Sequence, residues 1–136
     1  MNTKQLMKPL LLLFLSATLL TACSSDSSSS SGDTDQLFDK WWYDSEDFTA
    51  DVFFHADGTY EQYLEFAGMS FSNTGTWVWQ NESQKIMKVT YETGPNAVTE
   101  AWFKFSNIQE QSFNLKQSVD GTTYTDEARL YKDTDE

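Results

Sequence analysis

Two patterns of apolar residues divide this chain of 136 residues. Near the amino terminus, a mostly apolar run over residues 10–20 follows Lys4 and Lys8. From Gln36 onward, short apolar stretches alternate with polar residues and are separated by residues that favour turns. This order predicts a short hydrophobic leader followed by a region of β-strands.

The alternating region predicts about eight β-strands at a spacing of about ten residues. Asp57-Gly58, Gly94-Pro95 and Asp120-Gly121 carry residues that suit turn dihedral angles. The strands are expected at 40–43, 50–55, 59–66, 76–79, 85–92, 98–106, 112–117 and 122–132, with a looser stretch over 69–74. Regular short strands with local turns predict an all-β antiparallel meander that closes into a barrel or folds into a sandwich. Closure removes exposed strand edges.

Aromatic residues dominate the apolar content of this region. All five Trp, all six Tyr and nine of the ten Phe lie after residue 35. Such residues favour strands, and each buries a large area. A small barrel uses most of them to fill itself, so a packed interior, a small-molecule pocket and an exposed aromatic patch remain alternatives. Trp41-Trp42-Tyr43 and Trp102-Phe103 are adjacent rings, so at least one ring of each group must point outward.

The leader has the layout of a secretory signal peptide. Its apolar run is too short for a permanent bilayer-spanning helix, which needs about 20 apolar residues. The following segment, Leu20-Thr21-Ala22-Cys23, resembles the bacterial lipobox, whose cysteine receives a diacylglyceryl group and becomes the first residue after cleavage. An ordinary signal peptide with a chance cysteine at its end is the alternative. We expect residues 1–22 to be cleaved and Cys23 to attach the chain to a membrane.

The residues after Cys23 predict a tether and one domain. Residues 24–34 are rich in serine and lack apolar side chains, which is typical of a flexible linker. The expected organisation is a lipidated cysteine and tether over 23–35, one β-barrel domain over 36–132 and an acidic tail over 133–136. In Gram-negative lipoproteins, an aspartate directly after the lipidated cysteine resembles the signal for retention in the inner membrane. This chain has Ser24 at that position and so lacks that signal. The resemblance implies an outer-membrane lipoprotein of the Gram-negative cell envelope.

Charge and residue content argue against several functions. Without residues 1–22, 21 acidic and seven basic residues leave a formal charge of −14, which repels nucleic acid. Cys23 is the only cysteine and His55 the only histidine, and neither a Gly-x-Ser-x-Gly elbow nor a calcium-loop motif occurs. We therefore expect no enzyme activity, no catalytic residue, no bound metal and no cofactor.

The strand region also resembles a known family. Trp42, Phe53-Phe54, the segment Asp57-Gly58-Thr59-Tyr60 and the segment Thr74-Gly75-Thr76-Trp77 are together similar to small bacterial lipocalin-like domains. True lipocalins carry a Gly-x-Trp where Asp39 stands here. The resemblance covers about residues 37–132 and implies an up-and-down β-barrel that forms a calyx for a small apolar molecule.

The same resemblance implies a structural contact at the end of the barrel. In lipocalins a late basic residue packs on the tryptophan of the first strand. Here that residue would be Arg129, the only arginine, stacked on Trp41 or Trp42 as a cation–π pair.

Two functional hypotheses follow. In the first, a membrane-anchored, lipocalin-like barrel binds a small hydrophobic or amphipathic ligand. Seven apolar residues at alternating positions are the candidates to line its pocket: Phe54, Tyr60, Leu64, Trp77, Trp79, Phe103 and Phe113. In the alternative, the lipoprotein binds a basic protein partner through its acidic surface, as an inhibitor or an immunity protein would.

Overall fold

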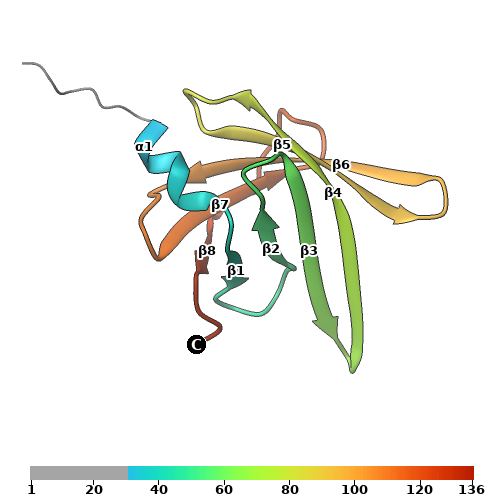
Figure 1. The fold of residues 1–136 in the computed structure, drawn as a ribbon. Helices are drawn as coiled ribbons and strands as arrows, with labels where there is room; N and C mark the ends of the chain where they lie inside the picture. The colour runs from blue at the N-terminus through green and yellow to red at the C-terminus, as the bar shows by residue number, and fades with distance from the viewer. Residues whose placement is uncertain (1–30) are drawn as a thin grey trace, which may run out of the picture.

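The computed structural model describes residues 31–136, which form eight antiparallel strands closed into a barrel (Figure 1). Each strand pairs with the next along the chain, and the last pairs with the first. The predicted all-β, up-and-down barrel is therefore confirmed. Its elements are α1 (Ser31–Thr34), η1 (Asp35–Leu37), β1 (Trp41–Asp44), β2 (Asp51–Phe54), β3 (Thr59–Phe66), β4 (Met69–Asn81), β5 (Ile86–Gly94), β6 (Ala97–Ser106), β7 (Ser112–Ser118) and β8 (Arg129–Lys132).

The predicted signal peptide, Cys23 and the tether as far as residue 30 lie outside the described residues. The tether was predicted to extend to residue 35, but helical residues already begin at Ser31. The following 3-10 helix places Leu37 against the barrel, where its side chain is fully buried. In the part of the chain that the structure describes, no helix is both long and apolar enough to cross a membrane.

Two strands differ in length from the prediction. β4 continues through the stretch expected to be looser, since Met69 to Thr76 pair with β3 without interruption. β8 begins at Arg129 rather than at residue 122. Local hydrogen bonds take up the backbone before it: the Asp120 carboxylate accepts the N–H groups of Thr122 and Thr123, both at 2.8 Å. Such side-chain acceptors compete with strand pairing.

Alternation along the strands separates the interior from the surface. Trp42 and Phe103 are at most 3% exposed, while their neighbours Trp41 and Trp102 lie on the outer face and are half-buried. The predicted outward rings are thus present. The interior is filled by buried apolar residues from the strands and η1: Leu37, Trp42, Val52, Phe54, Tyr60, Met87, Val89, Ala101, Phe103, Phe105, Phe113, Leu115 and Tyr131.

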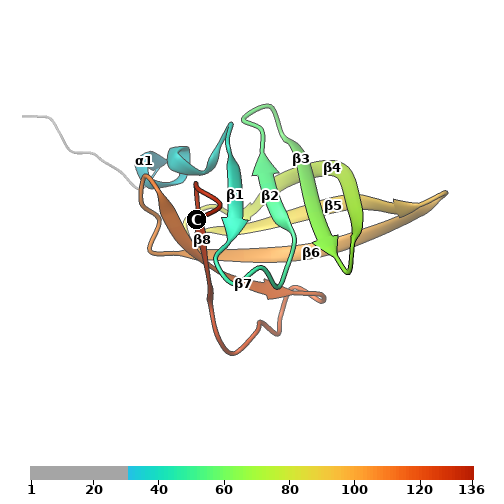
Figure 2. The ribbon, with the colours of Figure 1, turned by 90° about the horizontal axis from the view of Figure 1, so that it is seen from below.

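The N-terminal helical segment closes one end of the barrel. Leu37 accepts a hydrogen bond at its backbone oxygen from the Trp42 indole N–H at 2.9 Å. Phe38 stacks on Trp77 with ring centroids 5.0 Å apart, and its backbone bridges to Phe54. We call this the closed end, and Figure 2 shows α1 beside it.

The opposite, open end carries the β1–β2 loop (45–50), the turns of the β3–β4 and β5–β6 hairpins, and the β7–β8 loop (119–128). The two hairpins diverge there, as Figure 1 shows. Gly75 marks the divergence, because β4 pairs with β5 only from Gly75 onward. A Cβ atom at Gly75 would lie 1.9 Å from the backbone oxygen of Thr90, so only glycine permits this close approach.

Candidate functional site

Most of the predicted pocket-lining residues pack against one another in the core. Phe54, Tyr60 and Phe103 lie with ring centroids 5.6–6.1 Å apart in all three pairs and are at most 3% exposed. Phe113 stacks on Tyr131 at 5.2 Å and meets Trp42 edge-on at 4.7 Å. These rings occupy the space that a central ligand would need.

Trp77 and Trp79 lie toward the closed end. Their rings meet edge-on at 5.9 Å, and the Trp77 indole N–H donates to the backbone oxygen of His55 at 2.7 Å. Phe38 covers Trp77, so the stacked rings of Phe38 and Trp77 close this end of the barrel. Leu64 is the remaining candidate, and it lies on the part of β3 that extends toward the open end. The structure therefore brings six of the seven candidates together as core and places Leu64 apart.

The expected cation–π contact of Arg129 with Trp41 or Trp42 is not formed. The Lys40 ammonium lies 4.5 Å from the Trp42 ring centroid, while the Arg129 guanidinium lies 4.7 Å from that of Phe48. The reason is register. Arg129 pairs with Leu115 at the open-end start of β8, whereas Trp42 packs on Leu37 at the closed end.

A pocket of about 460 Å³ opens between the β1–β2 loop and the inner side of β7 and β8. The pairs Phe113–Tyr131 and Leu115–Arg129 lie two residues apart on the same ladder, so their side chains share the inner face. Leu115 is buried and forms the floor. We call this the open-end pocket, and its lining is Glu46, Phe48, Thr49, Leu115, Gln117, Thr125, Glu127, Ala128 and Arg129.

Asp44 holds the loop that covers this pocket. One carboxylate oxygen accepts the Glu46 N–H at 3.1 Å, and the other accepts the Phe48 N–H at 3.0 Å and both the N–H and hydroxyl of Thr49, at 2.7 and 2.9 Å. Burial alone would raise the pKa of Asp44, but these donors outweigh it and hold the pKa below its usual value. A short polar loop is thereby fixed with its single aromatic ring, Phe48, at the pocket edge.

Arg129 connects the pocket wall to the loop. Its guanidinium donates to Glu46 at 3.0 Å and to Asp44 at 3.4 Å while lying over the Phe48 ring. Phe48 itself is 74% exposed, which is high for a phenylalanine. The pocket thus joins apolar surface from Phe48 and Leu115 to both signs of charge, an arrangement suited to an amphipathic molecule.

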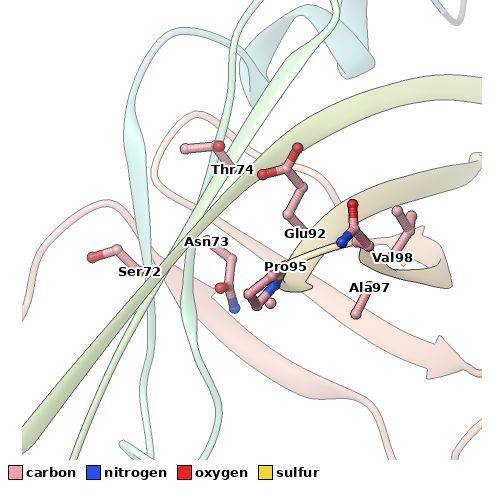
Figure 3. Close-up of a pocket in the computed structure, with 9 residues that line it drawn as sticks. Ser72, Asn73, Thr74, Glu92, Pro95, Ala97 and Val98 are labelled. Carbon is pink, nitrogen blue, oxygen red and sulfur yellow. The ribbon is translucent and has the colours of Figure 1, made fainter.

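Three further hollows lie on the surface. The first, of about 470 Å³, separates the diverging hairpins and is mostly polar; in Figure 3 the Asn73 side chain of β4 points toward Pro95, whereas Ser72 points away from it.

The second, of about 500 Å³, lies on the outside of the barrel beside Gly75. The third, of about 390 Å³, is lined by Asp47, Asp51, Glu65 and Asp135 with Leu64 as an apolar wall.

The single histidine is more engaged than the sequence indicated. His55 shares a 2.5 Å hydrogen bond with Glu61 and packs on Phe53, with ring centroids 4.2 Å apart. Both groups are on the outer surface, away from the open-end pocket. Among the residues that the structure describes, no group of three or more His, Cys, Asp or Glu side chains is placed to hold a metal ion.

Sequence reasoning missed the residues that form the open-end pocket. Phe48 carried one usable signal, because it is a lone aromatic residue inside the acidic segment from Asp44 to Thr49. Gln117 and Thr125 carried none, since polar residues near turns are common.

Comparison of the chain with protein-family models, with curated proteins and with solved structures found no match.

Proposed function

We propose that the chain is a lipid-anchored protein of the cell envelope whose barrel binds a small amphipathic ligand at its open end, without catalysis. The observation that carries this proposal is the open-end pocket. Its volume of about 460 Å³ lies within the range of small-molecule sites, about 300–1,000 Å³. It combines the Phe48 ring and the Leu115 floor with hydrogen-bonding groups from Thr49, Gln117 and Arg129.

The shape of the barrel supports this position for the ligand. Core rings fill the interior and η1 closes one end, so the open end is where a molecule reaches apolar surface from solvent. A ligand that buries about 200 Å² of apolar surface gains about 5 kcal/mol before ordering costs. We therefore expect weak binding, with a Kd of about 0.2 mM or weaker from the apolar contact alone.

Anchoring through Cys23 fits the same geometry. With seven residues between them, the Cα atoms of Cys23 and Ser31 can lie at most about 25–30 Å apart. Ser31 begins α1, which lies beside the closed end of the barrel. We place the lipid of Cys23 in the outer membrane of a Gram-negative cell. The open end of the barrel would then face away from that membrane.

Isothermal titration calorimetry with two simple amphiphiles tests the proposal. Decanoate and decyltrimethylammonium, below their micellar concentrations, offer the same chain length with opposite charges. At least one should bind, and Phe48→Ser should weaken it about tenfold by removing the main exposed apolar contact. Val78→Ser is the matched control, since Val78 is also exposed but lies on the outer face of β4. No binding of either amphiphile, or equal losses in both variants, would disprove the assignment.

A further inference from the structure

The β3–β4 hairpin presents an uncovered apolar face. Leu64 pairs with Phe71 and Phe66 pairs with Met69, so all four side chains lie on one face of the hairpin. That face is the continuation of the one that buries Tyr60 inside the barrel. Phe66, Met69 and Phe71 are 69%, 56% and 48% exposed. We call these four residues the hairpin face.

The hairpin itself is built with two unlike sides. The opposite face carries Tyr63, Glu65, Ser70 and Ser72, which suit contact with water. Figure 1 shows the hairpin projecting beyond the rest of the barrel. The hairpin face exposes on the order of 300 Å² of apolar surface, a size that in monomeric proteins is often functional. A strand pair with one apolar and one polar side is made to have its apolar side covered.

Charge beside the hairpin face indicates what covers it. Leu64 of the hairpin face lines a hollow that carries four carboxylates, Asp47, Asp51, Asp135 and, from the opposite face of the hairpin, Glu65; we call it the acidic hollow. None of these four takes part in the ion pairs found among the described residues. Burial, and then the charges of its acidic neighbours, raise the pKa of Asp51 to about 6. Among the described residues, no Lys, Arg or His forms an ion pair with these carboxylates, so the negative charge of the hollow is not balanced there.

We propose that the hairpin face docks a basic protein partner, whose apolar residues cover Phe66, Met69 and Phe71 and whose Lys or Arg side chains enter the acidic hollow beside Leu64. A second copy of this chain is a poor occupant, since identical acidic surfaces would repel each other across a symmetric contact. An anionic lipid surface is disfavoured for the same reason. The hairpin face shares no residue with the open-end pocket, while Thr49 lines both that pocket and the acidic hollow.

A photo-crosslinker at position 69 tests the docking in the cells that make the protein. The full chain carries a benzoylphenylalanine in place of Met69, or in place of Val78 as the control on the outer face of β4. The expected result is an adduct with one basic protein at position 69 that is absent at position 78. Adducts only with lipid, only with a second copy, or at neither position would overturn the proposal.

Binding to the partner so identified must then depend on the hairpin face. The double substitution Phe66→Ser with Phe71→Ser should weaken it about 30-fold, as expected for two residues at the centre of an interface. Both side chains are exposed, so the variant should keep the wild-type circular dichroism spectrum. Binding should also weaken as sodium chloride rises from 50 to 300 mM. An unchanged affinity in the double variant, or no salt dependence, would contradict the proposal.

The same variants separate this surface from the proposed ligand site. Phe48→Ser should leave partner binding unchanged, and Phe71→Ser should leave amphiphile binding unchanged. Loss of partner binding in Phe48→Ser with none in the hairpin variant would assign the partner to the open-end pocket and overturn the hairpin proposal.

Discussion

Replacing Asp44 tests how the open end is held together. The Asp44→Ala variant removes the acceptor for the N–H groups of Glu46, Phe48 and Thr49 and for the Thr49 hydroxyl. The Asp44→Asn variant keeps the shape but turns one acceptor into an amide that faces donors. Asp47→Asn is the matched control, because Asp47 is exposed in the same loop.

The magnitude follows from those contacts. A hydrogen bond to a charged group contributes about 1.5–3 kcal/mol, but the four share one carboxylate and are not additive. Once the carboxylate is removed, the N–H groups of the loop can also form hydrogen bonds with water, which reduces the loss of stability. We expect a loss of free energy of unfolding of about 3 kcal/mol for Asp44→Ala and about 2 kcal/mol for Asp44→Asn, against less than about 0.5 kcal/mol for Asp47→Asn.

Urea unfolding at several pH values measures these losses. Because the folded pKa of Asp44 lies below its usual value of 3.8, its contribution is complete above that value and is lost as the pH falls through the folded pKa. The gap between wild type and Asp44→Asn should therefore shrink below about pH 4. Amphiphile binding should weaken in Asp44→Ala, since Phe48 loses its support. A loss under about 1 kcal/mol in Asp44→Ala would refute the role given to this carboxylate.

Three other substitutions test separate parts of the structure. Gly75→Ala should unfold the barrel or cost about 3 kcal/mol or more in urea unfolding. Gly94→Ala should be nearly neutral, since its added Cβ meets nothing within 4 Å; similar losses in both would contradict the close approach at Gly75. Asp51→Asn should stabilise the protein at pH 7 by up to about 1 kcal/mol, after allowing for solvent screening. Because the folded pKa of Asp51 is raised to about 6, the wild-type protein becomes more stable relative to Asp51→Asn as the pH falls through 6. A difference in unfolding free energy between the two proteins that is as large at pH 5 as at pH 7 would contradict this prediction. Phe113→Ala should cost about 3–5 kcal/mol through a core cavity, and a milder loss would indicate a loosely packed interior.

The barrel was predictable from local features of the sequence. Period-two alternation and turns such as Asp57-Gly58 specify strands and hairpins within a few residues. Gly58 indeed has a positive φ of 97° and its N–H bonds to the backbone oxygen of His55 at 3.1 Å. The start of β8 at Arg129 was not predictable in this way, because the hydrogen bonds of Asp120 compete with strand pairing over 122–128.

The candidate site was less accessible to sequence reasoning. Alternation correctly gave Phe54, Tyr60 and Phe103 one face, but it cannot tell a filled barrel from a hollow one, because that depends on how ring volumes meet across the interior. The partner of Arg129 was likewise set by register between β7 and β8, which places it near Phe48 rather than Trp42. Where a strand leaves the barrel, inward residues such as Phe71 become surface, and only the three-dimensional pairing shows this.

The most direct test of the proposed function is an NMR titration of the isotope-labelled protein with the tighter-binding of the two amphiphiles. We expect saturable shifts of the backbone amides around the open-end pocket, at Phe48, Thr49, Gln117 and Arg129, with little change at the closed end near Phe38 and Trp77. Shifts centred on the closed end, or an unchanged spectrum, would contradict it.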